Sequence, residues 1–434
     1  MSVCSELLVR RLQTEGKILN LRSATKRRGC LLRILIYEYA VSEGLAGRTV
    51  SPGILSEGFG MLSSIASDFR KAEHQVATIV DRQLMRFNPT LHADLIVPIE
   101  SLGESRDTLG ELSKSVDAVL AIAPETEEKL KNIVKLLEKG NAKSLNSTSE
   151  SIGKISDKIK IHRTMEKNDL PVADWIRIEE NGDEREIEEI GRELGYPLVI
   201  KQAESVGCDG VSILEDESQI LQASKEIRKS GVGGFLAQRY IHGVAASAIV
   251  MSSPKGSTPL TLNLQRIKLE PSGSRSRYIG GAVPIHHSIE NEALKVAESA
   301  IETIEGLRGL VGVDLVLSEG GPVIMEINPR LTTSYIGVSN VARYNPAQLM
   351  LDGILKEKTP KSLKTSGCAF FSKIFHRDLT QETVQRLFTA DEVISPPFPV
   401  SYHDKHCSLA LTKGQNLEIA RQKFNSFKKS FQLL

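Results

Sequence analysis

The segment GVDLVLSEGGPVIMEINPR, residues 312–330, contains the side chains of this sequence best suited to do chemistry. Its two apolar runs flank a Glu-Gly-Gly turn, which predicts an antiparallel hairpin. Asp314 would lie on one strand, and Glu326 and Asn328 would share a face of the other, because strand side chains alternate. Two carboxylates and an amide oxygen are hard ligands that suit Mg²⁺, an ion that also contacts nucleotide phosphates.

Acidic residues beside a hairpin are often only solvated, and this second interpretation of the segment stays open. Glu326 favours a site, because it stands inside the apolar string VIMEI and an unpaired buried charge is costly. Arg330 lies two residues after Asn328, the next position of the same period-two face, and adds a fixed positive charge. Such a charge could steady a transferring phosphoryl group or an anionic intermediate.

A second chemical signal is Lys201, which ends the apolar strand pattern PLVIK. Gly207 and Gly210 follow within a few residues, and their backbone N–H groups could cradle phosphates. The segment is not a Walker A loop, which requires GxxxxGK[ST]. Taken alone, it fits an ordinary hairpin turn equally well.

The elements that must position these residues alternate along the chain. The first region predicts a parallel sheet with helices on both faces, from strands at 31–37, 75–80, 95–99 and 118–122 and helices at 56–71 and 125–138. The second region predicts helices at 152–168, 184–194, 219–229 and 290–305 among strands at 175–178, 197–201 and 211–214. The tail predicts strands at 369–375 and 408–411, a rigid spacer at 395–399 and a helix at 416–431.

Changes in composition divide the chain into four parts. Residues 1–30 are predicted to be a basic flexible extension, and residues 31–150 an N-terminal α/β domain that ends in the polar stretch 140–151. Residues 151–366 form the central domain, with a lid at about 172–242, and residues 367–434 a small C-terminal α+β module.

The composition excludes several classes of protein. The 434 residues include 55 Lys and Arg against 54 Asp and Glu, and this balance argues against a general reader of nucleic acid backbones. No apolar run approaches the roughly 18 residues that cross a bilayer, so no membrane partner is expected. The five cysteines lack metal-ligand spacing, which favours reduced thiols and a cytoplasmic location.

The net charge of the chain is close to zero but is unevenly distributed along the sequence. Residues 1–30 contain seven basic and two acidic side chains, and residues 401–434 contain six and two. The body between them is therefore acidic. A nucleotide site in such a body would depend on a few placed cations and bound metal rather than on a general positive field.

Taken together, the chemical segments resemble the ATP-grasp superfamily. The resemblance covers about residues 150–350 in order and spacing, and its matching segments are Asp157-Lys158, the strand 197–201 with the loop 207–211, the hinge 238–241 and the hairpin that ends at Arg330. It implies ATP held between two α+β subdomains, the smaller closing as a lid. It also implies Mg²⁺ (or Mn²⁺) on Asp314, Glu326 and Asn328, and catalytic roles for Arg330 and Lys201.

The same resemblance implies which residues contact the nucleotide. Lys158 and Lys201 would bind phosphates, beneath the lid loop of Gly207, Cys208, Asp209, Gly210 and Val211. The main chain of Gln238, Arg239, Tyr240 and Ile241 would face adenine. Many members place an acidic residue after the hinge glycine to bind ribose, whereas here Gly243 precedes VAAS, which leaves Ser247 as a candidate.

A narrower resemblance, over about residues 31–350, is to the ATP-grasp group that contains the tyramine-glutamate ligases of methanofuran biosynthesis. It is based on Glu38-Tyr39, the segment EGxxML at 57–62, the hinge YIxGVxxS at 240–247 and NPRLTTS at 328–334. The implied reaction is activation of a carboxylate by ATP to an acyl phosphate, with release of ADP, followed by amide formation with an amine. Glutamate and an amine such as tyramine are the substrates that the resemblance implies.

The residues that would bind the substrates are predicted less directly. Gln265 and Arg266, between hinge and hairpin, could hold a substrate carboxylate or form a solvated strand face. Glu38 and Glu57 lie near the carboxyl end of the first strand, where open parallel sheets bind ligands. They could hold a substrate ammonium, or simply cap a helix. The expected partners are small molecules, and a homodimer is one option for the assembly.

Three other functions compete with the ligase. A carboxylating enzyme like biotin carboxylase would use bicarbonate, and the tail resembles the small C-terminal module of such relatives, although no biotinylation motif is present. A non-catalytic ATP-binding sensor would lose the metal ligands, which are all present here. An interaction protein acting through its basic arm would depend on residues 1–30 alone.

Overall fold

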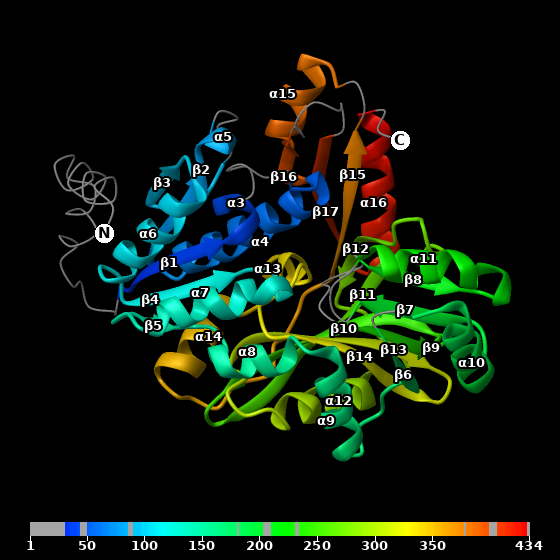
Figure 1. The fold of residues 1–434 in the computed structure, drawn as a ribbon. Coiled ribbons are helices and arrows are strands. Elements are labelled where there is room, and N and C mark those ends of the chain that lie inside the picture. Colours follow the sequence, from blue (N-terminus) through cyan, green and yellow to red (C-terminus); the bar gives the residue numbers. More distant parts are fainter. Residues whose placement is uncertain are drawn as a thin grey trace.

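The computed structural model describes residues 31–43, 50–85, 90–179, 182–202, 210–230, 234–376, 379–398 and 406–431. Three sheets organise this part of the chain, one for each broad region in Figure 1. The predicted basic extension 1–30 lies outside the described residues, as do Gly207, Cys208 and Asp209 of the predicted lid loop. No helix among the described residues is long and apolar enough to cross a membrane.

The N-terminal region contains a five-stranded parallel sheet in the order β3-β2-β1-β4-β5. Its strands are β1 (Arg33–Glu38), β2 (Gln75–Asp81), β3 (Leu95–Ile99), β4 (Ala118–Ile122) and β5 (Lys143–Ser144). The central strand β1 is buried along almost its whole length, as a strand covered on both faces must be. Two apolar clusters fill the space on its two faces, which confirms the α/β prediction for this region.

Helices α3 (Tyr39–Glu43), α4 (Pro52–Lys71), α5 (Arg82–Met85), α6 (Leu102–Ser113) and α7 (Lys129–Leu137) follow the strands. Helix α4 begins four residues before the predicted start, because the Ser51 side chain accepts the Ile54 N–H and Pro52 suits the first turn. The predicted helix from residue 125 instead begins at Lys129, after a short 3₁₀ turn (Thr126–Glu128). Glu125 is therefore a loop residue at the carboxyl edge of the sheet.

The single helix predicted at 152–168 is wrong. The structure has α8 (Ser149–Ile155) and α9 (Lys158–Lys167), separated at Asp157. The Asp157 carboxylate accepts the N–H groups of Ile159 and Lys160 and so starts a new helix. This break places Lys158 at the first position of α9, with its side chain directed into the protein.

The central sheet has eight strands in the order β14-β13-β10-β11-β12-β15-β17-β16. The strands are β10 (Val244–Ser253), β11 (Gly256–Lys268), β12 (Arg277–Val283), β13 (Gly309–Ser318), β14 (Gly321–Asn328), β15 (Cys368–His376), β16 (Val393–Phe398) and β17 (His406–Gly414). Helices α12 (Glu290–Glu302), α13 (Tyr335–Val341), α14 (Pro346–Leu355), α15 (Gln381–Thr389) and α16 (Leu417–Ser430) pack around it (Figure 1).

The strands of the tail continue this same sheet, because β15 pairs with β12 of the central region. The prediction of a rigid spacer at 395–399 is wrong, because residues 393–398 form the edge strand β16. An edge strand tolerates the two prolines, which have no N–H to donate to a second neighbour.

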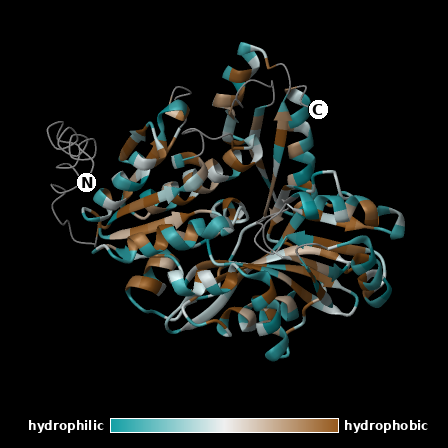
Figure 2. Cartoon of the chain, viewed as in Figure 1, coloured by the Kyte–Doolittle hydropathy of each residue, from teal (hydrophilic) through white to brown (hydrophobic). Residues whose placement is uncertain are grey.

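The third sheet is a separate antiparallel layer in the order β6-β9-β7-β8. It consists of β6 (Trp175–Ile178), β7 (Leu198–Gln202), β8 (Val211–Leu214) and β9 (Phe235–Arg239), with α10 (Glu184–Leu194) and α11 (Ile220–Ser230) against it. This layer has its own small apolar core. Figure 2 shows that apolar residues, in brown, are concentrated in the strands, whereas the helices carry many polar residues, in teal.

Candidate active site

A large cleft of about 2660 Å³ lies where the three sheets meet. Its walls include Glu38 from the N-terminal sheet, Lys201 from the third sheet (β6-β9-β7-β8, the predicted lid), and Asp314 and Glu326 from the central sheet. Strand β15 of the tail supplies a further wall through Lys373. Most of the residues that the sequence marked for chemistry therefore border one space.

The β13–β14 hairpin brings the predicted metal ligands together. Asp314 and Glu326 are direct cross-strand partners, and a bulge follows Asp314. The Asp314 carboxylate accepts hydrogen bonds from Gln265 Nε2 at 2.9 Å and from Asn328 Nδ2 at 3.3 Å. Removal from water, and next the charge of Glu326, raise the pKa of Asp314 to about 7. Asp314 and Glu326 thus face each other across the hairpin, and the two carboxylates repel one another.

The donor set of this hairpin fits a magnesium ion. Mg²⁺ prefers oxygen ligands and is usually bound by one or two carboxylates together with phosphates and water. No group of three or more His, Cys, Asp and Glu side chains that could hold a metal ion occurs among the described residues, so the donor set here is two carboxylates and the Asn328 amide. Burial and the neighbouring Glu326 charge raise the pKa of Asp314, and a bound cation would offset both effects.

Five residues form a chain of contacts from strand β7 of the third sheet to the hairpin, one of them through a main-chain carbonyl. Lys201 Nζ donates to Gln238 Oε1 at 2.7 Å, and Gln238 Nε2 lies 3.1 Å from His162 Nε2. His162 Nδ1 lies 2.7 Å from the Lys158 carbonyl, and Lys158 Nζ forms an ion pair with Glu326 at 3.3 Å. Burial, and next the charge of Lys201, lower the pKa of His162 to about 4. His162 is therefore neutral near pH 7, donating through Nδ1 and accepting through Nε2.

The remaining predicted nucleotide residues lie in different surroundings. Gly210, Val211, Tyr240 and Ile241 border the cleft. Arg239 also borders it, with its guanidinium paired to Asp174 at 3.0 Å. The N–H groups of Arg239 and Tyr240 donate to the carbonyls of Asp174 and Pro197 within the lid.

Ser247 lies on the central sheet rather than in the lid. It is directly opposite Asp314 on the neighbouring strand, and its Oγ is 3.3 Å from Ser334 Oγ. Its side chain is buried at the cleft wall. Its role in ribose binding stays a prediction.

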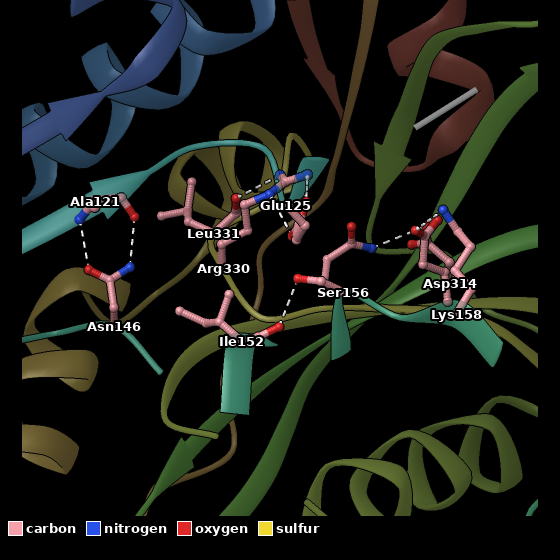
Figure 3. Close-up of polar contacts among 11 residues, drawn as sticks. Ala121, Glu125, Asn146, Ile152, Ser156, Lys158, Asp314, Arg330 and Leu331 are labelled. Atoms are coloured by element: carbon pink, nitrogen blue, oxygen red, sulfur yellow. Dashed lines mark hydrogen bonds and ion pairs between the residues drawn. The ribbon is translucent and has the colours of Figure 1, made fainter. Parts of the chain in front are cut away.

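Arg330 is held by a residue that the sequence did not mark. Its Nε and Nη2 donate to the two carboxylate oxygens of Glu125 at 3.0 and 3.2 Å, as Figure 3 shows. Both side chains are largely buried, with 15% and 8% of their surface exposed. Glu125, and next Glu326 and Asp314, raise the pKa of Arg330 against the effect of burial. The fixed cation of the hairpin is thus tied to the N-terminal sheet.

The predicted substrate carboxylates lie close together beyond Arg330. Glu38 ends β1, and its Oε2 accepts the Val41 N–H at 2.8 Å. Glu57, one turn inside α4, accepts the Thr333 hydroxyl at 2.7 Å and pairs with Lys373 at 2.5 Å. Lys373 Nζ also lies 5.4 Å from the ring centre of Tyr278.

Gln265 and Arg266 point in different directions, as neighbours on a strand do. Gln265 faces the hairpin through Asp314. Arg266 lies over the Phe370 ring at 5.1 Å and donates to Ser372 Oγ at 3.1 Å. The two side chains cannot both hold one substrate carboxylate at the hairpin, and Gln265 is the one placed there.

Sequence reasoning missed His162, Glu125 and Lys373. Lys373 had a usable signal, since it is a charge within the apolar strand FFSKIF. His162 lies one helical turn after Lys158, but the predicted helix had the wrong start. Glu125 had no local signal, because its partner is 205 residues away in the chain.

Comparison with known protein families gives two matches. A model described as the ATP-grasp domain matches residues 155–334, and one described as the pre ATP-grasp 3 domain matches residues 74–152. Two relatives named tyramine–L-glutamate ligase are similar in sequence. The protein from Methanocaldococcus fervens is 28% identical over 70% of this chain and 89% of its own length, and that from Methanocaldococcus jannaschii is 27% identical over 76% and 91%.

Solved structures share the fold at low sequence identity. An ATP-grasp superfamily protein from Archaeoglobus fulgidus aligns with a TM-score of 0.60 and 21% identity over 87% of this chain and 99% of its own. The biotin carboxylase domain of 2-oxoglutarate carboxylase from Hydrogenobacter thermophilus, solved with MgADP and bicarbonate, aligns with a TM-score of 0.67 and 14% identity over 91% and 88%. These likenesses confirm the predicted fold.

Proposed function

Because this chain belongs to the ATP-grasp superfamily as a carbon–nitrogen ligase, we propose that it joins a carboxylate to an amine through an acyl phosphate, releasing ADP and phosphate. The observation that supports this most directly is the meeting of three charged groups at one cleft. These are the Asp314–Glu326 carboxylate pair, the chain of contacts from Lys201 to Lys158 and the fixed Arg330.

The first half-reaction is transfer of the γ-phosphoryl group to the substrate carboxylate. One carboxylate oxygen attacks phosphorus in line, and the bond from phosphorus to the β-phosphate oxygen breaks to release ADP. Positioning and charge neutralisation supply most of the rate in such transfers. We assign Lys201 and Lys158 to the phosphates, and Arg330 to the carboxylate and the charge that develops on the phosphoryl oxygens.

Asp314, Glu326 and Asn328 would hold the magnesium ions. Bound Mg²⁺ would neutralise phosphate charge and orient the nucleotide. Glu326 pairs with Lys158, and with nucleotide bound Lys158 would contact the phosphates while Glu326 would serve the metal. Gln265 and Asn328 keep Asp314 oriented.

The second half-reaction is attack of an amine on the acyl phosphate. The relatives named above join tyramine and L-glutamate, and we propose glutamate and an amine such as tyramine as the first pair to test. The cleft beyond Arg330 suits such an amine. It combines the carboxylates of Glu38 and Glu57 with the aromatic rings of Tyr39 and Tyr278.

The test is a screen for phosphate release with MgATP and a panel of amino acids and amines, alone and in pairs. The proposal predicts ADP formation only when one acid and one amine are both present, with the amide detected by mass spectrometry. Bicarbonate alone as the second substrate would instead indicate the carboxylating alternative. Lys201→Met should remove turnover, and Lys225→Met, on the exposed face of the lid helix α11, serves as the matched control.

A further inference from the structure

Glu38 is placed where a substrate would meet it. It is the last residue of β1, the middle strand of the N-terminal parallel sheet, and it pairs there with Ile122 of β4. Ligands of open parallel sheets bind at this carboxyl edge. Glu38 borders the cleft although only 4% of its surface is exposed.

The protein backbone is shaped around this carboxylate. A Cβ atom at Gly58 of α4 would lie 2.5 Å from each Glu38 carboxylate oxygen, which is too close for any side chain. A larger residue at position 58 would have to displace the Glu38 carboxylate. The carboxylate is thus clamped between α4 and the start of α3, where the Val41 N–H donates to Oε2.

No cation compensates Glu38 within the part of the chain that the structure describes. Its Oε2 accepts the Val41 backbone N–H, and none of the ion pairs of the described residues includes it. Three neighbouring carboxylates differ, since Glu57 pairs with Lys373, Glu125 with Arg330, and Glu326 with Lys158. Asp314 of the hairpin also has no ion pair with a described residue, but two side-chain amides donate hydrogen bonds to it. An uncompensated buried carboxylate favours either a proton or an incoming cation.

The groups that face Glu38 explain its proton affinity. Glu57 of α4 adds a like charge, while Arg330 attracts from the hairpin but is already bound by Glu125. Lys373 of β15 lies behind Glu57 and pairs with it. Burial is the largest effect and raises the pKa of Glu38 to about 7, whereas its backbone hydrogen bonds act in the opposite direction.

We propose that Glu38 is a catalytic residue of the second half-reaction, which binds the ammonium group of the amine substrate and accepts its proton before attack on the acyl phosphate. The inference rests on the proposed ligase function, and it adds proton acceptance to the ammonium binding that the position of Glu38 in the sequence predicts. A primary amine is protonated near pH 7 and has no electron pair to attack with, so a ligase of this kind needs a proton acceptor near the incoming nitrogen.

The step balances in protons and electrons. The ammonium nitrogen gives one proton to Glu38, which becomes a neutral carboxylic acid. The freed electron pair of nitrogen forms the bond to the acyl carbon, and the bond from that carbon to the phosphate oxygen breaks. Phosphate leaves with that electron pair and takes the second nitrogen proton, and Glu38 returns its proton to solvent after product release.

Hydroxylamine distinguishes proton acceptance by Glu38 from a role in forming the acyl phosphate. It is mostly unprotonated at neutral pH and attacks acyl phosphates directly, so hydroxamate formation reports the first half-reaction without a proton acceptor. Glu38→Gln keeps an oxygen that can accept the Val41 N–H but cannot take a proton. The matched control is Glu43→Gln, a buried carboxylate at the end of the short helix α3 that follows Glu38; it accepts a hydrogen bond from Tyr37 and does not border the cleft.

The expected result is a selective loss. Glu38→Gln should lower kcat/KM for the amine by about 100-fold or more, the usual contribution of a general base, while hydroxamate formation changes little. Glu43→Gln should retain both reactions. In the unaltered protein at saturating amine, the amide rate should fall below about pH 7 while the hydroxamate rate does not, and this comparison needs no variant.

Several outcomes overturn the inference. Equal retention of both reactions in Glu38→Gln shows that Glu38 accepts no proton, and equal loss of both in a folded variant places it in the first half-reaction. Parallel pH profiles for amide and hydroxamate formation in the unaltered protein also contradict it. If the unaltered protein forms neither product with any carboxylate, the proposed ligase function itself is wrong.

Discussion

Arg330 and Glu125 form a two-point ion pair that joins the end of the β13–β14 hairpin to the N-terminal sheet, with contacts of 3.0 and 3.2 Å (Figure 3). The planar guanidinium is bound along two of its N–H directions, so its orientation is fixed. The remaining N–H groups can serve a substrate. Glu125 therefore connects the two domains at the point where the acyl phosphate would form.

Removing Glu125 should affect stability and activity together. Glu125→Ala leaves a buried guanidinium without its partner, and loss of one member of a buried pair costs about 3 kcal/mol or more of unfolding free energy. Urea denaturation checks this value, and KM for the carboxylate should rise. The exposed pair Arg228–Glu184 provides the control, because Glu184→Ala should cost less than about 1 kcal/mol. Equal costs for the two variants would contradict the buried role of Glu125.

Lys201 should matter for phosphoryl transfer more than for the fold. Lys201→Met removes a cation but keeps the length of the side chain, and loss of one electrostatic stabiliser typically lowers kcat by about 100-fold or more. ADP formation under saturating substrates measures this effect. Normal turnover in Lys201→Met would remove the chain of contacts between the two lysines from the mechanism.

Lowering the pH should reduce the contribution of His162 to the stability of the fold. The folded pKa of His162, about 4, lies below the value of about 6.5 for an exposed histidine, so the unfolded chain takes up a proton first as pH falls. The contribution of neutral His162 to the free energy of unfolding is fully present above about pH 6.5. It decreases toward pH 4, by up to about 3 kcal/mol. Lys201, Lys158 and Glu326 are the charges that face this ring.

Urea denaturation of the unaltered protein and of His162→Gln at pH 7, 6 and 5 measures this contribution. Subtracting the two cancels other titrations, including those of Glu38 and Asp314, whose raised pKa values act in the opposite direction. The stability advantage of the unaltered protein should shrink with acid. A difference that stays constant with pH would contradict a neutral buried His162.

Lys373 and Glu57 should show strong coupling across the cleft. Lys373→Met leaves the Glu57 carboxylate largely buried without its cation, which should cost about 3 kcal/mol. The double variant Lys373→Met/Glu57→Gln removes both charges and should recover part of that loss. Strictly additive losses would show that the tail strand contributes no charge pairing to the cleft.

The fold could be predicted from sequence largely because its strands are apolar and its order of elements is regular. Strands β2, β3 and β4 lie where the apolar runs predicted them. The errors arose where local chemistry overrides a periodic pattern. Asp157 caps a helix in the middle of an amphipathic run, and the prolines of β16 lie on a sheet edge.

The site could be predicted only in the parts that are local in sequence. Asp314, Glu326 and Asn328 belong to one hairpin, so alternation alone places them together. The pairs Arg330–Glu125 and Glu57–Lys373 join residues 205 and 316 positions apart, and no local pattern indicates them. The sequence also does not show that Glu38 is a buried carboxylate without an ion pair among the described residues. This follows only from the packing of α4 and α3 around it.

The most direct test of the account is the nucleotide product formed with a carboxylate and an amine present together. With MgATP, glutamate and tyramine or a related pair, the account predicts ADP, phosphate and the amide in equal amounts, with only background ADP when either substrate is omitted. Release of AMP and pyrophosphate would contradict the acyl-phosphate mechanism, and ADP formation independent of the amine would contradict the ligase.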